Sequence, residues 1–270
     1  MKYAIVYRDD NRSRELTEHF HELADTHELI HDEKKPDIVL SIGGDGTMLQ
    51  AFHKYIERLD QISFVGIHTG RLGFFADWKP DKIEEVASLM YHSSEKDHGL
   101  RVVEYPVVEV EITTAQGVEK RYALNEITFK SMFITLVAQL SINDEPFETF
   151  RGDGICISSP SGSTAYNKSL GGAIVHPAIE AIQITEIASI NNRVFRTLGS
   201  PIILPKHHHI DIVPKSQQGF ILTVDHQAMQ LHDVKSIRCR VSPDKKVKFA
   251  RFRPFPFWMR VREAFIGTEF

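Results

Sequence analysis

Residues 41–47 read SIGGDGT, and this stretch decides the fold of the first part of the chain. An apolar run at 38–42 leads into it and predicts a buried β-strand. Apolar residues at roughly helical spacing follow over 48–55 and predict a helix. A strand, a glycine-rich turn and a helix in this order present backbone N–H groups to phosphate. Glycine pairs also occur in loops that only need positive φ, so the turn alone is a weak signal.

Asp45 is the residue that makes this turn informative. A carboxylate in a phosphate-binding turn repels the anionic ligand, so it must serve a purpose. It could hold a metal ion that bridges phosphates, or it could accept the proton of a hydroxyl group that is being phosphorylated. Both roles indicate a kinase. The turn is not of the Walker type because no Gly-Lys-Ser/Thr follows, and it lacks the Gly-x-Gly-x-x-Gly spacing of dinucleotide folds.

Length and composition bound the remaining possibilities. The chain has 270 residues, 42% of them hydrophobic, which suffices for two modest domains with their own cores. A formal net charge of −4 without an evident basic face disfavours nucleic acid as a partner. The apolar runs are too short to span a bilayer, so we expect no membrane association. Cys156 and Cys239 suit a cytoplasmic protein with reduced thiols, because they form neither a disulfide framework nor a metal motif.

The first hundred residues alternate between strand and helix patterns. The expected strands are 3–7, 38–42 and 63–68, and the expected helices are 13–24, 47–58 and 83–91. Such alternation predicts a Rossmann-like α/β domain over 1–100, with helices on both faces of a parallel sheet. Ligands of such sheets bind beyond the carboxyl ends of the strands, which is where residues 43–47 fall.

From residue 101 onward, short strands follow one another and predict an antiparallel β-sandwich over 101–250. The expected strands include 122–129, 136–142, 155–158, 201–204, 209–213, 220–224, 236–241 and 246–252. One helix-like interruption is expected at 179–190, and the domain boundary is expected in the polar stretch 94–101. The tail, 251–270, is rich in aromatic residues and proline; we expect a short amphipathic helix there, packed back on the first domain.

Two polar segments of the second domain are candidates for ligand contact. Residues 150–154 read FRGDG and 158–167 read SSPSGSTAYN. Their hydroxyl and N–H groups can bond a ribose or a phosphate, and Tyr166 can pack on a base; the alternative is an ordinary connecting loop. Asn125 and Glu126 interrupt an apolar strand, so at least one of them needs a buried partner or a ligand, unless they belong to a plain edge strand.

Two histidine-containing segments are less specific. Asp225 and His226 end a predicted strand, where the histidine could donate to a phosphate or simply cap a turn. Three consecutive histidines stand at 207–209, and we expect a structural or surface role for them. Neighbouring side chains of a strand point to opposite faces, so the three cannot all meet one ion.

Together these segments resemble the NAD kinase family, in the compact form found in Gram-positive bacteria. The glycine-rich turn is shared with lipid kinases of the diacylglycerol type and, more loosely, with phosphofructokinases. The stretch 160–166 combined with Asn125 and Glu126 separates NAD kinases from both. The matching stretches are GGDGT at 43–47, HTGRLGF at 68–74, LNE at 124–126, FRGDG at 150–154, PSGSTAY at 160–166 and TVDH at 223–226.

The resemblance implies transfer of the γ-phosphoryl group of ATP, or in some members of polyphosphate, to the 2′-hydroxyl of the adenosine ribose of NAD, giving NADP. It also implies a divalent ion such as Mg²⁺, whose protein ligands it does not assign, and homo-oligomers, commonly tetramers built as dimers of dimers. Asp45 matches the general base, and Gly44, Gly46 and Thr47 match the loop that handles the phosphates of ATP. The residues that match contacts to NAD are Asp45, Gly46, Leu49, Phe74, Asn125, Glu126, Arg151, Asp153, Ser161, Thr164, Ala165, Tyr166, Ser169, Ala188, Asp225 and His226.

Two other functions remain open on the sequence. A lipid or other small-molecule kinase could reuse residues 43–47, although no apolar acceptor pocket or membrane-binding face is evident. A catalytically silent dinucleotide sensor of the same fold is the second alternative, and retention of Asp45 argues against it. Phosphorylation of NAD, phosphorylation of a lipid, or binding without turnover distinguishes the three.

Overall fold

The computed structural model describes residues 1–70, 72–93, 100–216 and 219–267. The chain folds as two compact units. The first unit consists of Met1–Glu104 and Lys246–Phe270, and the second consists of Tyr105–Lys245. The C-terminal segment therefore belongs to the first unit. Much of the boundary stretch expected at 94–101 lies outside the described residues.

A parallel sheet forms the centre of the first unit. Its strand order is β2 (Ile30–His31), β1 (Lys2–Tyr7), β3 (Ile38–Gly43), β4 (Ser63–His68) and the end of β16 (Val234–Arg251). The last pairing is parallel and joins Phe249 to Phe64. Every residue of β3 is buried, as a central strand covered on both faces requires.

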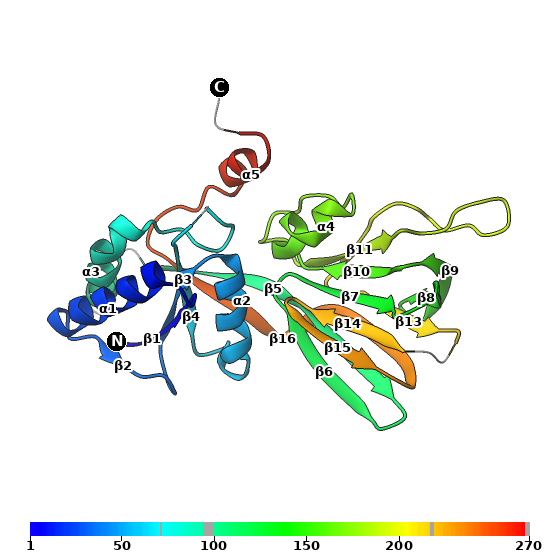
Figure 1. Cartoon of the computed structure of the whole chain (residues 1–270), viewed down its shortest axis with the longest axis horizontal. Coiled ribbons are helices and arrows are strands. Elements are labelled where there is room, and N and C mark those ends of the chain that lie inside the picture. Colours follow the sequence, from blue (N-terminus) through cyan, green and yellow to red (C-terminus); the bar gives the residue numbers. More distant parts are fainter. Residues whose placement is uncertain (71, 94–99, 217–218, 268–270) are drawn as a thin grey trace. The chain divides into compact units, whose positions relative to one another are not determined.

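Helices cover both faces of this sheet (Figure 1). α1 (Asn11–Thr26) and α3 (Ile83–Ser93) lie on one face, and α2 (Asp45–Lys54) lies on the other. The side chain of Asp10 caps α1 by accepting a hydrogen bond from the N–H of Ser13. The predicted Rossmann-like arrangement is therefore confirmed.

Three helices of the first unit begin two residues earlier than the sequence pattern indicates. The helix expected at 13–24 starts at Asn11, and the helix expected at 47–58 starts at Asp45 and stops at Lys54, before a separate 3₁₀ turn (Ile56–Arg58). The C-terminal helix, which the pattern predicts over 259–266, is α5 (Phe257–Phe265) and follows Pro256 directly. The N-cap residues are Asp10, Gly44 and Pro256, which an apolar periodicity does not register.

Two antiparallel sheets form the second unit. The first has the order β12 (Ile202–Pro205), β11 (Ala181–Ile187), β10 (Gly154–Ser158), β7 (Glu126–Ser131), β14 (Phe220–Val224) and β15 (Gln227–Leu231). The second contains β9 (Glu145–Gly152), β8 (Leu136–Ile142), β13 (His209–Pro214), β16, β5 (Arg101–Thr114) and β6 (Val118–Ala123). One core draws side chains from both sheets, among them Val108, Phe129, Phe150, Phe220 and Ile237. The predicted β-sandwich is confirmed.

The helix expected at 179–190 is wrong. Residues Ala181–Ile187 form strand β11, which pairs antiparallel with β10 on one side and β12 on the other. The segment is rich in isoleucine, and its β-branched side chains suit a buried strand between two neighbours. A short apolar run of this length cannot be assigned from periodicity alone.

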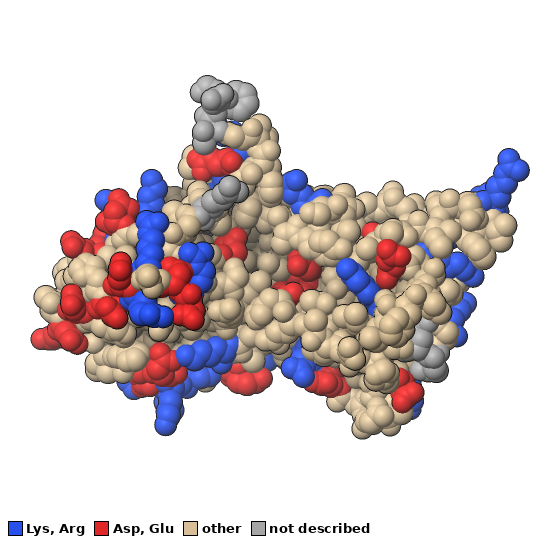
Figure 2. Space-filling view, viewed as in Figure 1, with Lys and Arg blue, Asp and Glu red and all other residues tan. Residues whose placement is uncertain are grey.

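The surface of the described residues carries charges of both signs. On the face drawn in Figure 2, Lys and Arg side chains are interspersed with Asp and Glu. Among the helices that the structure describes, none combines the length and apolar character needed to cross a bilayer.

The shared sandwich core yields a prediction about stability. Phe220 is fully buried on β14, and its ring centroid lies 4.9 Å from that of Phe129. We expect Phe220→Ala to lower the free energy of unfolding by about 3–5 kcal/mol, because it removes apolar contacts and leaves a cavity. Phe147→Ala, on the exposed part of β9, should cost less than about 1 kcal/mol. Urea denaturation measures both, and equal effects would contradict the assignment of the core.

Candidate active site

The glycine-rich turn is built around the start of α2. Gly44 is the N-cap, and its N–H donates to Oγ1 of Thr47 at 3.3 Å. This bond fixes the buried Thr47 hydroxyl inside the first turn. Gly43 leaves room for the hydroxyl, because a Cβ at Gly43 would lie 2.1 Å from Thr47 Oγ1. Gly43 and Thr47 therefore shape the turn through protein contacts alone.

Gly44 and Gly46 need a different explanation. A Cβ at either position would meet no protein atom within 4 Å, and neither residue has a positive φ. Neither packing nor backbone conformation therefore requires glycine at these two positions. Close approach of a ligand to the N–H groups at the start of α2 would require it, because a side chain would obstruct the ligand. These two glycines support the predicted phosphate loop.

The Asp45 carboxylate is held by backbone N–H groups of a second loop. Oδ2 accepts a hydrogen bond from the N–H of Phe74 at 2.9 Å, and Oδ1 accepts one from the N–H of Phe75 at 3.0 Å. Gly73 permits this approach, because a Cβ there would lie 2.2 Å from Asp45 Oδ1. Both oxygens of Asp45 thus have a fixed direction.

The surroundings of Asp45 favour a basic carboxylate. Burial raises the pKa of Asp45 above its usual value, while the two N–H groups and the charge of Arg260 act in the opposite direction. A carboxylate with a raised pKa is a better proton acceptor than an ordinary one. The surroundings of Asp45 therefore suit a proton-accepting role.

The two apolar residues predicted in the first unit are placed differently. Leu49 is buried on α2. Phe74 is half-buried, and its ring lies 5.7 Å from that of Phe265 and 6.3 Å from that of Phe257, both on α5. One side of Phe74 thus packs against the C-terminal helix.

In the second unit, Asp225 organises the segment that contains Asn125 and Glu126. Its carboxylate accepts hydrogen bonds from the N–H groups of Leu124 at 2.9 Å, Asn125 at 2.7 Å and Glu126 at 3.2 Å. Asp225 occupies the turn between β14 and β15 with a φ of 54°. Its carboxylate therefore supports the backbone of this segment, a role that sequence reasoning did not foresee.

The serine-rich loop packs on the same segment. The N–H of Ser159 donates to the carbonyl of Asn125 at 2.8 Å, and its hydroxyl donates to the carbonyl of Leu124 at 2.5 Å. The same hydroxyl accepts a bond from the N–H of Gly162 at 3.0 Å. Gly162 is required here, because a Cβ would lie 2.1 Å from the carbonyl oxygen of Asn125. Ser159 joins the two predicted segments and was not singled out by the sequence pattern.

Four buried side-chain polar atoms on these two segments have no hydrogen-bond partner in the structure. Three are oxygens, Oδ1 of Asn125, Oε2 of Glu126 and Oγ of Ser161, and the fourth is Nδ2 of Asn167. A buried polar atom left without a partner costs about 1–3 kcal/mol, so these atoms call for an explanation. A ligand that carries hydroxyl groups would satisfy the three oxygens.

Glu126 is the titratable member of this group. Burial, and then the negative charge of Asp225, raise the pKa of Glu126 to about 7, although the N–H of Tyr166 lowers it. The carboxyl therefore changes its charge close to neutral pH. A bound hydroxyl group finds a stronger acceptor in the ionised form.

The remaining predicted residues form two groups along strand β10. Thr164 and Ala165 belong to the turn after Ser161, with bonds to the carbonyls of Ser161 at 3.3 Å and Gly162 at 2.9 Å respectively. Tyr166 follows them, and its hydroxyl accepts a bond from Lys130 Nζ at 3.3 Å. Ser169 ends the short helix α4 (Tyr166–Ser169), and His226 lies beside Asp225; both are exposed.

Arg151, Asp153 and Ala188 lie at the other end of β10. The register places Ser158 opposite Glu126 but Gly154 opposite Lys130, so the ends are about 13 Å apart at the usual rise of a strand. The N–H of Asp153 donates to the carbonyl of Ile187 at 3.0 Å, next to Ala188. Arg151 lies over the ring of Phe195 at 4.2 Å. The predicted NAD contacts of this unit therefore form an extended set.

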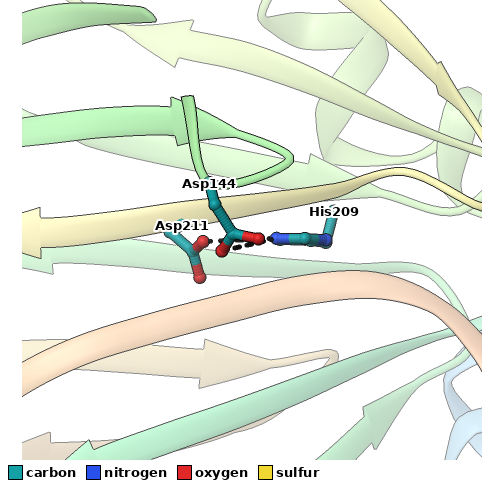
Figure 3. Close-up of side chains that lie close together, drawn as sticks. All are labelled: Asp144, His209 and Asp211. Atoms are coloured by element: carbon teal, nitrogen blue, oxygen red, sulfur yellow. Dashed lines mark hydrogen bonds and ion pairs between the residues drawn. The ribbon is translucent and has the colours of Figure 1, made fainter. Parts of the chain in front are cut away.

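A separate cluster in the second unit has the composition of a metal site. Asp144, His209 and Asp211 direct ligand atoms toward one another (Figure 3). Arg238 already occupies their carboxylates, with Nε 2.7 Å from Asp211 and Nη2 2.6 Å from Asp144. A cation there would meet the guanidinium charge, so we interpret the cluster as an ion-pair network. His207 and His208 do not belong to it; they precede strand β13, so the argument from strand alternation does not apply to them.

A glycine-rich turn at a helix N-terminus, with a carboxylate beside it, suits a phosphotransferase. Two family models extend this conclusion. The model for the ATP-NAD kinase N-terminal domain matches residues 4–95, and the model for the ATP-NAD kinase C-terminal domain matches residues 124–252. The chain belongs to the ATP-NAD kinase family, and the family predicted from its motifs is confirmed.

Named relatives match this chain over its whole length. It is 54% identical over 271 residues to NAD kinase 1 of Bacillus cereus, covering 100% of both chains. It is 52% identical to NAD kinase 1 of Bacillus subtilis, covering 99% of each. The predicted enzyme class, a phosphotransferase with an alcohol group as acceptor, agrees with these relatives.

Solved structures share the fold. Yeast NADH kinase, crystallised with NADH, superposes with a TM-score of 0.81 at 20% identity, over 99% of this chain and 87% of that one. An NAD kinase from Archaeoglobus fulgidus in complex with ATP superposes with a TM-score of 0.74 at 24% identity, over 94% of both. At these identities the similarity establishes the fold class alone.

The contrast between the glycines of the turn yields a prediction. We expect Gly46→Ala to keep or slightly raise the unfolding temperature, because alanine fits a helical position without a clash, while the affinity for ATP falls. Gly43→Ala should instead lower the unfolding temperature, because its Cβ displaces Thr47. Thermal unfolding and ATP titration of both variants provide the test. Unchanged ATP affinity in Gly46→Ala would contradict a phosphate loop at this turn.

Proposed function

We propose that this chain is an NAD kinase that transfers the γ-phosphoryl group of ATP to the 2′-hydroxyl of the adenosine ribose of NAD, producing NADP. The full-length identity to Bacillus proteins named NAD kinase supports the reaction. The structural observation that carries the proposal is the group of unpartnered buried atoms on Asn125, Glu126 and Ser161, which suits a ligand with ribose hydroxyls.

In this reaction Asp45 acts as the general base. The ribose 2′-oxygen attacks the γ-phosphorus, the bond from that phosphorus to the β,γ-bridging oxygen breaks, and ADP leaves. The proton of the hydroxyl passes to Asp45. A sugar hydroxyl is a poor nucleophile, so a base within hydrogen-bond reach contributes about 10²–10⁴-fold to the rate. Burial of Asp45 and its two fixed oxygens support this role.

The phosphates of the donor bind at the start of α2, where Gly44, Gly46 and Thr47 lie. Among the described residues, the one group of side chains suited to a cation is already paired with Arg238. A Mg²⁺ ion bound together with ATP would be held mainly by phosphate oxygens, and it would supply positive charge against the charge of the transferred group. Polyphosphate is an alternative donor on the same loop.

The NAD molecule takes its contacts from both predicted groups of the second unit. Asn125, Glu126 and Ser161 hold the adenosine ribose, and the partly exposed ring of Tyr166 packs against the nucleotide. Arg151, Asp153 and Ala188 serve the other end of the molecule. Thr164, Ala165, Ser169, Asp225 and His226 complete this set. Leu49 and Phe74 are the apolar residues that we propose as further NAD contacts.

The enzyme acts as a homo-oligomer, a dimer of dimers, in the cytoplasm. Large apolar side chains on the second unit support an oligomer, since Phe133 is 84% exposed, Val194 79% and Ile134 64%. Phe133 and Ile134 are adjacent in the chain, and contiguous exposed apolar surface usually marks an interface. Two buried reduced cysteines, Cys156 and Cys239, support a cytoplasmic location.

The proposed reaction is tested first by a coupled assay. Purified protein is mixed with NAD, ATP and Mg²⁺, and NADP is detected with an NADP-specific dehydrogenase. We expect Asp45→Asn to lower kcat by about two to four decades, because it removes the base, while NAD binding is retained. Asn125→Ala should instead weaken NAD binding.

The outcomes of this assay separate the alternatives. Unchanged turnover in Asp45→Asn would refute the role of this residue as base. NAD binding without NADP formation in the wild type would favour the silent sensor. Phosphorylation of a lipid emulsion but not of NAD would favour a lipid kinase.

The raised pKa of Glu126 predicts a pH dependence of NAD binding. Above about pH 7 the carboxylate is ionised and accepts ribose hydroxyls; below it, protonation removes this acceptor. We expect the Kd for NAD to rise about tenfold between pH 8 and pH 6, as the ionised fraction falls. Glu126→Gln should bind NAD weakly at both pH values. Calorimetric titration measures this, and tighter binding of wild type at pH 6 would refute the assignment.

A further inference from the structure

We propose that Arg260 is a positioning residue for Asp45, acting through the peptide group that joins Gly73 to Phe74. This inference rests on the proposed role of Asp45 as general base. It concerns the C-terminal helix α5, to which neither the sequence motifs nor the proposed reaction assigns a role. All the contacts that carry it lie within the first unit.

Arg260 is a buried arginine that bonds backbone carbonyls. Its Nη1 donates to the carbonyl of Gly73 at 2.7 Å and to that of Ala76 at 2.8 Å. Its Nη2 lies 3.3 Å from Oδ1 of Asp77, which is also buried. A single guanidinium therefore holds both ends of the segment 73–77.

The same segment holds Asp45. The N–H groups of Phe74 and Phe75 donate to the Asp45 carboxylate, and they lie between the two carbonyls that Arg260 binds. The carbonyl of Gly73 and the N–H of Phe74 belong to one planar trans peptide, so they point in opposite directions. Arg260 and Asp45 thus bind the two sides of one peptide plane.

This arrangement couples the two residues physically. A hydrogen bond to the carbonyl of an amide polarises the group and strengthens the bond that its N–H donates, by about 10–30%. The rotation of the peptide plane is also fixed from both sides. Loss of Arg260 frees the plane to rotate, and the Asp45 carboxylate then loses its fixed direction.

Other contacts keep the segment from moving as a whole. A Cβ at Gly66 of β4 would lie 2.6 Å from Cα of Ala76, so the backbones at Gly66 and Ala76 are in contact. The N–H groups of Asp77 and Trp78 both donate to the carbonyl of Gly66 at 3.0 Å. Replacing Arg260 should therefore loosen residues 73–75 locally while Ala76 and Asp77 stay on β4.

The positive charge of Arg260 should also affect the pH dependence of kcat. Arg260 shares Asp77 with the buried Arg251, and Arg253 and Glu263 are the other charged groups whose fields act on it. The charge of Arg260 favours the ionised form of Asp45, whose pKa burial raises. Removing that charge raises the pKa of Asp45 further. The acid limb of the kcat profile must then move to higher pH.

The experiment compares three variants by kcat, KM and pH profile. Arg260→Gln removes the charge and the guanidinium that binds both carbonyls. Arg260→Lys keeps the charge, but its shorter side chain with a single nitrogen cannot reproduce the contacts to Gly73, Ala76 and Asp77 together. Arg262→Gln is the matched control, because Arg262 is an exposed arginine on the same helix. Thermal unfolding and NAD titration are recorded for each variant.

We expect Arg260→Gln to lower kcat about 10- to 100-fold at neutral pH, with KM for NAD within about twofold. Its acid limb should move up by about one pH unit, so that part of the activity returns at high pH. Arg260→Lys should keep the wild-type acid limb with an intermediate kcat. Arg262→Gln should match the wild type in every measurement.

Two outcomes would overturn the inference. One is an Arg260→Gln enzyme with the wild-type kcat and acid limb; the other is a rise in KM for NAD that accounts for the whole loss. If Arg260→Gln does not fold, Arg260→Lys provides the test, and a wild-type kcat in that variant would overturn the positioning role of Arg260.

Asp45→Asn is assayed in parallel. An active Asp45→Asn enzyme would refute the proposed base. An inactive Asp45→Asn enzyme together with a normal Arg260→Gln enzyme would refute only the positioning role of Arg260.

Discussion

The hydrogen bonds from the Phe74 and Phe75 N–H groups to the Asp45 carboxylate are the constraint on which the first unit depends. They bring the loop after β4 against the start of α2, and they require glycine at position 73. In the second unit, the carboxylate of Asp225 likewise accepts hydrogen bonds from three consecutive N–H groups at the start of β7. In each unit a carboxylate orders the backbone of a segment that is distant in sequence.

The two carboxylates differ in what surrounds them. Asp45 faces an arginine and a helix N-terminus, which favour its ionised form against the cost of burial. Asp225 instead adds negative charge beside Glu126 and raises the pKa of that residue. The first arrangement suits proton transfer during catalysis, and the second suits a binding site tuned by pH. Similar local geometry therefore serves different chemistry because the neighbouring charges differ.

Much of this could be read from the sequence, and the gaps have physical causes. Residues 43–47 predicted the strand, turn and helix because apolar periodicity and glycine are local signals. Strand β11 was missed because a short buried strand and a buried helix share the same composition. Asp225, Ser159 and Arg260 act through backbone groups distant in sequence, and no periodicity reports such partners. The pairing of Asp225 with residues 124–126 spans about a hundred positions.

The return of residues 246–270 to the first unit has a consequence for biogenesis. A ribosome makes the chain from its N-terminus, and domains generally fold as they emerge. The continuous stretch 105–245 can complete its own core while the first unit still lacks the end of β16 and all of α5. Asp45 thus acquires its full surroundings only after α5 has been made. Until then the second unit can be complete while the first is not.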